Sequence, residues 1–551
     1  MFVSVIFNVE YMDISSRKMW YLKNLQHCKE NGWILITHEF LIRNFKEMQD
    51  SISDRFIEQF EMQRLSSEEL NDLEQYYVPD EIFDSIESAA GGRTNALFEL
   101  STKPNRKLEE SLRRIFVKIK ERHPNEKIEG IFHCLEGYES LCRIARENSC
   151  PLINYSFSAF RKVHGYRQTL YFANIYDRFW SGNECKNRYH RFIEENRSSF
   201  PVLTNKELIA LIGKEHTLPL IQLINSKPKY EMGVCCECYS ILPQVFINSK
   251  YTDDDIFFEC KRLYGSENLK VRSHAAHLND IQIDRSEVHN DPVSTILSCK
   301  RVTAVQSQIL LKSLLWGRTT ITKTNSLGFS YLCDNDYQSD RIAEIQGLNY
   351  YIFGYLIPSD LMFSDQYWKW RLTNPYETEI YSLHQNTLLR TLGIDQIKLF
   401  SLSGEERLRY ILDTRGCDDQ LINDIVSDKI IDNINWDVAS SQFDVITESG
   451  CKSFWRINTV KENGILSSKL VVNLKDVKAI KFYPLYDVAG FARLVKVRIN
   501  THDIILDKDM TSFKFLPKNN GFYFFDVEDQ DKTRLDIECK WEYKKINEFL
   551  I

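Results

Sequence analysis

Two short segments in the middle of the chain carry side chains that suit an anionic group. Arg272 and His274 end an apolar segment that the sequence predicts to be a strand. Ser307 and Gln308 precede a predicted helix from Ile309 to Trp316. A guanidinium and an imidazole suit a phosphate, and so do the free N–H groups of a helix start, which the helix dipole assists. Two simpler alternatives remain: Ser307 only caps the helix, and His274 only satisfies a loop carbonyl.

The segments around these residues predict a Rossmann-like unit over residues 214–345. Apolar runs predict strands at Thr217–Ile224 and Ile241–Ile247, and helical spacing predicts a helix at Asp254–Tyr264. The strand of Arg301–Val305 runs into the Ser307 turn and its helix, which stops at Gly317 before a last strand at Thr319–Thr322. Ligands of such sheets bind at the carboxyl ends of the strands.

Residues 1–213 predict a first unit of the same kind. Buried strands are expected at Phe2–Phe7, Trp33–Thr37, Gly130–Cys134 and Pro151–Tyr155, with helices between them. A long charged helical region is expected over Lys46–Tyr77, and a basic, aromatic loop is expected after the last strand. Two such halves without a G-x-G-x-x-G fingerprint indicate an α/β protein of GT-B-like architecture, with two Rossmann-like domains facing a cleft.

The remainder divides into two further segments. Residues 346–435 predict a helical segment packing on the two lobes, in which Trp368, Trp370, Leu388 and Leu392 recur at helical spacing as packing residues. Residues 436–551 change to alternating apolar runs separated by turn residues, which predict a β-sandwich accessory domain.

Composition excludes several classes of protein. The formal net charge of -7 argues against a broad electrostatic grip on nucleic acid. The 14 cysteines are scattered, which is typical of reduced thiols in a cytoplasm. Cys235, Cys236 and Cys238 have no second ligand pair at a workable spacing, so a structural origin is favoured over a metal site. We expect no signal peptide and no membrane span.

With these segments placed, residues 130–330 resemble the retaining β-Kdo glycosyltransferases of bacterial O-antigen and capsule assembly, GT-B enzymes that use CMP-Kdo. The resemblance lies in segment order more than in identical residues. Its segments are Pro151–Arg161, Gly165–Phe172, Leu218–Gln222, Val271–His274, and Val305–Gln308 followed by Leu314–Arg318. In the same order, these segments are similar to five features of the family. The features are the strand with its loop arginine, the tyrosine-bearing loop, the Pro-Leu-Gln strand end, the Arg-x-His-Pro turn, and the Asn-Ser-Ser turn with its helix.

The chain departs from that family at three places. His274 is followed by Ala275 instead of proline. Asn225 stands near the place of the family's candidate nucleophile, a carboxylate that a covalent adduct would require. Ser156 is nearest to an expected glutamate. An alignment shifted by a few residues would bring other carboxylates to these places; otherwise the protein uses another mechanism, another donor or no chemistry.

The resemblance implies a role for each of these residues. Arg272, His274, Ser307 and Gln308 would bind the nucleotide's phosphate or ribose. Arg161, Arg167 and Gln222 would bind the sugars, the arginines through a carboxylate, although one of them is also a candidate for a surface salt bridge. Glu136 is the candidate general base, with a helix-dipole partner as the alternative, and Asn225 occupies the nucleophile's place. Basic groups and helix N–H donors would replace a metal in stabilising the leaving group.

We therefore expect a cytoplasmic glycosyltransferase that moves a sugar, a Kdo-like acid from CMP-Kdo, onto a bacterial surface polysaccharide or lipopolysaccharide. Its expected partners are the nucleotide-sugar donor and a glycan or lipid-linked glycan acceptor, with no nucleic acid, no cofactor and no metal. Association with the inner face of the inner membrane or with an assembly complex stays open. The alternatives are another nucleotide-sugar transferase or epimerase on the same fold, and a catalytically inactive glycan-binding homologue.

Overall fold

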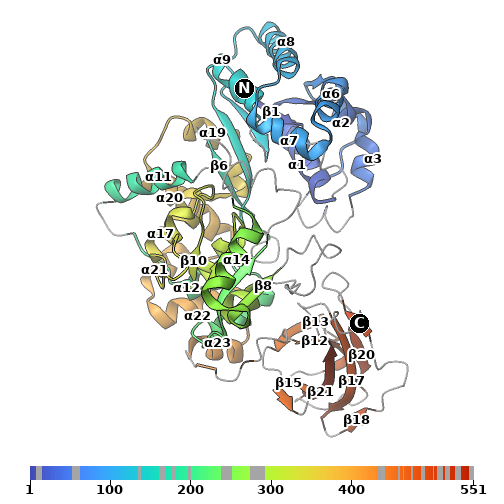
Figure 1. Cartoon of the computed structure of the whole chain (residues 1–551), viewed down its shortest axis with the longest axis vertical. Helices are drawn as coiled ribbons and strands as arrows, with labels where there is room; N and C mark the ends of the chain where they lie inside the picture. Colours follow the sequence, from blue (N-terminus) through green and yellow to red (C-terminus); the bar gives the residue numbers. More distant parts are fainter. Residues whose placement is uncertain are drawn as a thin grey trace.

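The computed structural model describes most of the chain. The described residues are 1–7, 15–52, 57, 62–134, 138–160, 169–175, 182–196, 200–236, 251–272, 292–427, 430–431, 434, 441–448, 450–456, 460–462, 465–472, 476–484, 490–500, 502–504, 513–515, 522–527 and 535–544. They form an α/β body with two sheets rich in parallel pairs, followed by two antiparallel sheets. Figure 1 shows the first lobe at the top, the second lobe below it, and the antiparallel sheets at the lower right. None of the described helices is both long and apolar enough to cross a bilayer.

The first sheet has seven strands in the order β11-β6-β5-β4-β1-β2-β3. Its strands are β1 (Phe2–Ile6), β2 (Ile34–His38), β3 (Gln75–Val78), β4 (Gly130–Cys134), β5 (Leu152–Phe157), β6 (Leu170–Asn174) and β11 (Ile357–Pro358). The strands β1 to β5 pair in parallel, whereas β6 pairs antiparallel with both β5 and β11. The parallel part therefore has the order 3-2-1-4-5 of a Rossmann half, with its switch point between β1 and β4.

Helices cover both faces of the first sheet because its strands are apolar on both sides. One face packs against α1 (Ser15–Asn31), α2 (Glu39–Arg43), α3 (Phe45–Asp50) and α5 (Ser67–Asn71). The other face packs against α6 (Asp80–Ala90), α7 (Arg93–Thr102), α8 (Arg106–Arg122) and α9 (Glu139–Glu147). Because β1 to β5 run in parallel, their carboxyl ends lie at one common edge of the sheet.

The second sheet has four parallel strands in the order β10-β9-β7-β8. Its strands are β7 (Tyr230–Cys235), β8 (Leu269–Arg272), β9 (Cys299–Thr303) and β10 (Thr319–Ile321). Its connections contain the helices α14 (Asp253–Tyr264), α15 (Val293–Ser298) and α16 (Ile309–Leu315), and the short 3-10 helix η3 (Ser266–Asn268). Most of the strand and helix positions predicted from Asp254 onward are confirmed.

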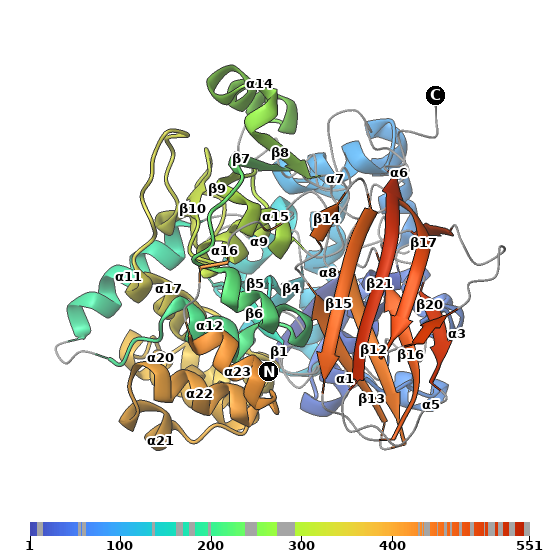
Figure 2. The same ribbon diagram turned by 90° about the horizontal axis from the view of Figure 1, so that it is seen from below.

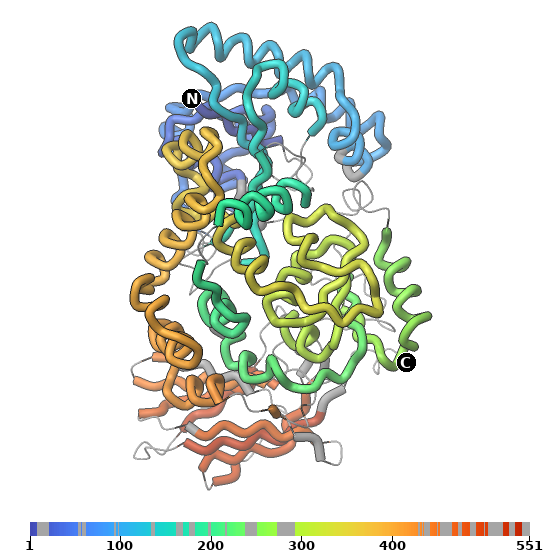
Figure 3. The backbone as a smooth tube through the Cα atoms, turned by 90° about the vertical axis from the view of Figure 1, so that its left-hand side faces the viewer, coloured from blue at the N-terminus to red at the C-terminus, as the bar shows by residue number. Residues whose placement is uncertain are grey.

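A helical region joins the two sheets. Between them in sequence lie α11 (Asn183–Glu195) and α12 (Asn205–Ile212), and after the second sheet come η5 (Ser330–Leu332), α17 (Ile345–Tyr350) and the π-helical turn η6 (Tyr351–Tyr355). The chain then returns to the first sheet as β11, followed by α18 (Ser359–Met362), α19 (Asp365–Arg371), α20 (Glu377–Thr391), α21 (Gln396–Ser401), α22 (Gly404–Thr414) and α23 (Asp419–Val426). Figure 3 shows this yellow-to-orange region running down one side of the molecule.

The C-terminal region consists of two packed antiparallel sheets, as predicted. One has the order β13-β12-β16-β20 and the other β14-β15-β21-β17-β18, with β19 pairing with β17. The strands are β12 (Ser441–Thr447), β13 (Gly450–Arg456), β14 (Val460–Glu462), β15 (Ile465–Val472), β16 (Val477–Tyr483), β17 (Gly490–Ile499), β18 (His502–Ile504), β19 (Phe513–Phe515), β20 (Tyr523–Asp526) and β21 (Leu535–Lys544). Figure 2 looks onto the larger sheet, with the smaller one behind it. Phe482 and Trp541 meet in the core between them.

Two predicted elements are wrong. The run Thr217–Ile224 is the 3-10 helix η1 (Glu215–Leu223), not the first strand of the second unit. The region Lys46–Tyr77 is not one long helix, because its described residues include the short helices α3 and α5 and the strand β3. The predicted basic loop after β5 lies outside the described residues except at its end, and the strand β6 that follows it pairs with β5 from Asn154↔Asn174 to Phe157↔Tyr171. The predicted strand Ile241–Ile247 lies outside the described residues.

Candidate functional site

The carboxyl edge of the second sheet brings Arg272 and the Ser307 turn to the two sides of one strand. β7 pairs with β8 through Cys235↔Arg272 and with β9 through Val234↔Thr303. β8 follows β7 along the chain on one side, and β9 then starts on the other. This change of direction makes the β7/β9 boundary the topological switch point, where open α/β sheets bind ligands.

Hydroxyl groups from the loop after β10 hold the turn between β9 and α16. Thr322 Oγ1 donates to the Val305 carbonyl at 3.1 Å, and Ser326 Oγ donates to Gln306 Oε1 at 3.2 Å. Ser326 also accepts a hydrogen bond from Thr324, and its peptide N–H donates to Thr324 Oγ1. The backbone of this turn is therefore fixed before any ligand arrives, as preorganised binding requires.

Ser307 is a poor cap for its helix. Its Oγ lies 3.5 Å from the Ile309 nitrogen, at the outer limit of a hydrogen bond, and Gln308 at the N-cap position makes no side-chain cap. The Gln308 Oε1 atom is buried and accepts no hydrogen bond from the residues that the structure describes. Both side chains, which are half-buried, therefore keep hydrogen-bonding capacity at the switch point.

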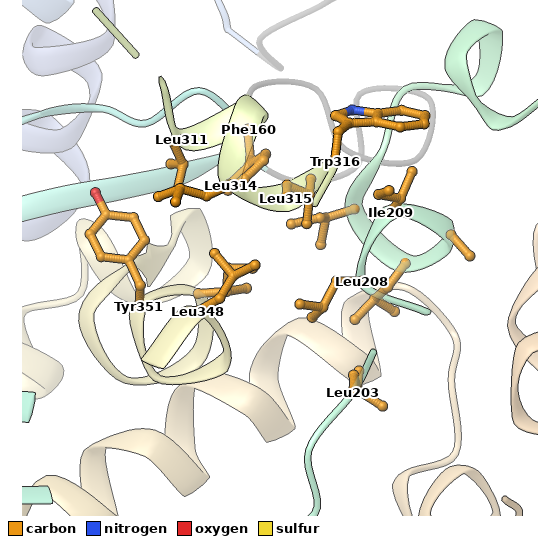
Figure 4. Packing of buried hydrophobic residues seen from close by; sticks show 14 of the residues in the cluster. Phe160, Leu203, Leu208, Ile209, Leu311, Leu314, Leu315, Trp316, Leu348 and Tyr351 are labelled. Carbon is orange, nitrogen blue, oxygen red and sulfur yellow. The ribbon is translucent and has the colours of Figure 1, made fainter. Parts of the chain in front are cut away.

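Apolar packing sets the direction of α16. Figure 4 shows Leu311, Leu314, Leu315 and Trp316 packed among Leu208 and Ile209 of α12 and Leu348 of α17. Almost every residue of this short helix is buried. This packing anchors the carboxyl end of α16. The amino end of the helix, which follows β9, lies at the carboxyl edge of the second sheet, where β8 ends at Arg272.

Arg272 is the last residue of β8, and its side chain is buried. Its carbonyl accepts a 2.8 Å hydrogen bond from the Cys236 nitrogen, which extends the β7–β8 ladder by one step. Lys270, two residues earlier on the same strand, is also buried. The strand therefore carries a buried guanidinium to its carboxyl end.

The structure does not bring Asn225 to this edge. Asn225 is exposed just after η1, and the preceding Ile224 carbonyl accepts a 2.9 Å hydrogen bond from Arg318, the residue before β10. Residues that precede the strands lie at the amino edge of the sheet, opposite Arg272. Gln222, which is half-buried, belongs to the same 3-10 helix. Glu136, Arg161, Arg167 and His274 lie outside the described residues.

The carboxyl edge of the first sheet carries a histidine–aspartate pair that the sequence analysis missed. His38 ends β2, and Asp80 begins α6 just after β3. His38 Nδ1 lies 3.3 Å from Asp80 Oδ1, which also accepts a 2.8 Å hydrogen bond from the Phe40 nitrogen. The imidazole is 1% exposed, and its buried Nε2 has no hydrogen-bond partner among the described residues. A histidine placed directly after a buried strand was the signal available in the sequence.

We predict that His38 makes the protein less stable in acid. Burial lowers the pKa of His38 to about 4 from 6.5, although the hydrogen bond to Asp80 opposes that shift. The unfolded chain therefore binds the proton first, so the stability is complete above pH 6.5 and is lost as the pH falls toward 4, by about 3 kcal/mol in total. Urea unfolding at several pH values between 7.5 and 4.5 measures this loss. His38→Asn should give a flatter profile than the native protein, and parallel profiles would contradict the assignment.

Comparison with known proteins gives a partial likeness. The chain resembles two sugar transferases in part. Both solved structures are of Thermosulfurimonas dismutans KpsC. The β-Kdo 2,4 transferase is 15% identical, with a TM-score of 0.28 over 40% of this chain and 78% of that one. The β-Kdo 2,7 transferase is 12% identical, with a TM-score of 0.30 over 44% and 82%. No family model and no curated protein matches.

Proposed function

We propose that the protein is a glycosyltransferase that takes its sugar from a nucleotide donor bound at the carboxyl edge of the second sheet. The observation that carries the proposal is the strand order β10-β9-β7-β8, which sets Arg272 on one side of β7 and the Ser307 turn on the other. A guanidinium and a preorganised turn with spare donors and acceptors suit a diester or diphosphate at a switch point.

The presence of two Rossmann-like sheets in one chain favours transfer over simple nucleotide binding. Each sheet has a carboxyl edge with polar groups, His38 and Asp80 on the first and Arg272 and Ser307 on the second. In the GT-B arrangement that we propose, the second edge holds the donor and the first faces the acceptor. The donor sugar that we propose is a Kdo-like acid on CMP, from the order of the segments in the sequence, and the acceptor is a bacterial surface glycan.

Nucleotide binding and turnover test the proposal directly. The protein is titrated by calorimetry with CMP, UDP and GDP, then incubated with CMP-Kdo and with UDP- and GDP-sugars in the presence of a glycan acceptor. Release of CMP supports the proposal in full. Release of UDP or GDP, or an isomerised donor, supports another transferase or an epimerase on this fold. Binding of glycan without binding of any nucleotide would overturn it in favour of a glycan-binding protein.

We predict that Arg272→Gln weakens nucleotide binding by about tenfold or more, because one hydrogen bond to a charged group contributes about 1.5–3 kcal/mol. Ser307→Ala should weaken it by a smaller factor. Lys300→Gln is the matched control, because Lys300 lies near the amino end of β9 and pairs with Asp340 instead. Equal affinities in all three variants, with each one folded by circular dichroism, would refute this placement of the nucleotide.

A further inference from the structure

The outer face of the smaller C-terminal sheet carries two exposed aromatic rings. Phe522 precedes the edge strand β20 (Figure 2) and Phe524 lies on it, and these residues are 43% and 44% exposed. Phe524 points away from the core, because its neighbours Tyr523 and Phe525 pack inside the sandwich. Exposed aromatic rings on an edge strand promote association in solution. Their presence therefore indicates a ligand or a partner.

The strand register places polar side chains beside these rings. Lys481 of β16 pairs with Phe524 on one side and with Asp444 of β12 on the other. Residues that face each other in an antiparallel pair share one side of the sheet, and Gln442, two residues before Asp444, lies on that side too. The Lys481 ammonium also lies 4.7 Å from the ring centroid of Phe522. The outer face therefore combines aromatic rings with an amide, a carboxylate and an ammonium group.

Gln442 and Asp444 keep hydrogen-bond acceptors that the described residues do not use. Gln442 is 6% exposed, and its Nε2 donates to Asp444 Oδ1. A carboxylate only accepts hydrogen bonds, so the amide nitrogen must face Asp444. The buried Gln442 Oε1 then has no donor among the residues that the structure describes. Asp444 receives no ion pair from the cations of that same part of the chain. Acceptors left in this way favour a ligand that brings donors.

The outer face of the larger sheet shows what a solvated face looks like in the same sandwich. There Glu538 pairs with Lys469 at 3.1 Å, and Asp503 pairs with Lys496 at 2.7 Å and with Arg498 at 3.2 Å. Charges of both signs that compensate each other are typical of a surface that contacts only water. The smaller sheet differs in both respects, since it has exposed rings and a carboxylate outside any such network.

The mixture of groups discriminates between possible occupants. An apolar partner would cover Phe522 and Phe524 but would leave the acceptors of Gln442 and Asp444 unsatisfied, which costs free energy. A nucleic acid would bring its phosphates against Asp444 and the exposed Asp526. A sugar fits both kinds of group: its C–H face packs on an aromatic ring, and its hydroxyls donate to amide and carboxylate oxygens.

We propose that the outer face of the smaller sheet binds a glycan chain, which stacks on Phe522 and Phe524 and donates hydroxyl hydrogen bonds to Gln442 and Asp444. The face spans two inter-strand steps from β12 to β20, about 10 Å. This length exceeds one pyranose ring, so the ligand is a segment of a chain and not a single sugar. The site belongs to the C-terminal sheets alone, so the proposal does not rest on the nucleotide site or on sugar transfer.

Electrophoresis of the full-length protein in native gels tests the proposal. The gels contain dextran, galactomannan or hydroxyethyl cellulose as neutral probes, or polygalacturonate as an acidic one, and we expect at least one neutral polymer to retard the protein. Phe524→Ala should weaken this binding by about threefold to tenfold, because a half-exposed ring contributes only part of the energy of full burial. Asp444→Asn should weaken it too, since an amide oxygen accepts more weakly than a carboxylate. Phe258→Ala is the matched control, because Phe258 is 60% exposed on α14 and should leave binding unchanged.

Three results would overturn the proposal. The first is that no neutral polymer retards the native protein, including the case in which polygalacturonate alone does so. The second is that Phe524→Ala binds as tightly as Phe258→Ala. The third is a native dimer that Phe524→Ala converts to a monomer by size-exclusion chromatography without any glycan binding, which would make this face an interface between two copies. If Phe524→Ala does not fold, Asp444→Asn decides: weaker retardation supports the site, and unchanged retardation removes it.

Discussion

Replacing Glu377 by glutamine should lower the free energy of unfolding by about 3–5 kcal/mol, the usual cost of breaking a buried ion pair from one side. Arg188 is buried and donates its Nε to both carboxylate oxygens, so the uncharged amide leaves its charge without compensation. Urea unfolding followed by tryptophan fluorescence measures the loss.

A double variant tests whether the loss of stability comes from the unpaired charge of Arg188. Arg188→Met combined with Glu377→Leu removes both charges and should recover most of the lost stability, because well-packed apolar residues often replace a buried pair without cost. Glu405→Gln is the control, since Glu405 pairs with Arg409 on an exposed helix surface and should change stability by less than about 0.5 kcal/mol. A loss in Glu377→Gln no larger than that of the control would contradict the prediction.

Replacing Trp368 by alanine should cost about 3–5 kcal/mol. Trp368 on α19 is fully buried, and its ring meets Phe132 of β4 edge-on at a centroid distance of 5.3 Å. Its indole nitrogen donates to the Met362 carbonyl at 2.6 Å. The substitution leaves a large cavity under the first sheet and an unsatisfied carbonyl, and thermal unfolding should show the loss as a lower midpoint.

Trp370, two residues further on, provides the matched control. It is only half-buried at the edge of the same core, so Trp370→Ala should cost clearly less than Trp368→Ala. Equal losses at the two positions would mean that α19 is held by its surface contacts and not by the core of the first lobe.

The alternation of strands and helices could be predicted because buried parallel strands leave a clear apolar pattern. β1, β2, β4 and β5 were found from such runs, and the C-terminal strands were found from alternation. The run at 217–224 was misassigned because a short apolar segment has no period that separates a strand from a buried helix. Leu218, Ile221 and Leu223 are all buried, so η1 needs apolar residues on every side.

The candidate site was less predictable, for reasons of topology. The positions of Arg272 and the Ser307 turn on the two sides of β7 depend on the strand order β10-β9-β7-β8, which no local sequence pattern records. The amino-edge position of Asn225 could not be seen once η1 was taken for a strand. The cluster around Glu377 was invisible because Arg188 lies 189 residues away in sequence, and no local spacing records such a pair.

The return of the chain through β11 has a consequence for how the protein is made. Ile357 and Pro358 add the last strand to the first sheet, and Trp368 and Met362 fill the space beneath it. A nascent chain emerging from the ribosome lacks these residues until the whole second sheet has been synthesised. The first lobe must therefore wait, with part of its apolar interior uncovered, for a segment encoded far downstream. The first lobe is thus synthesised before the second sheet but can be completed only after it.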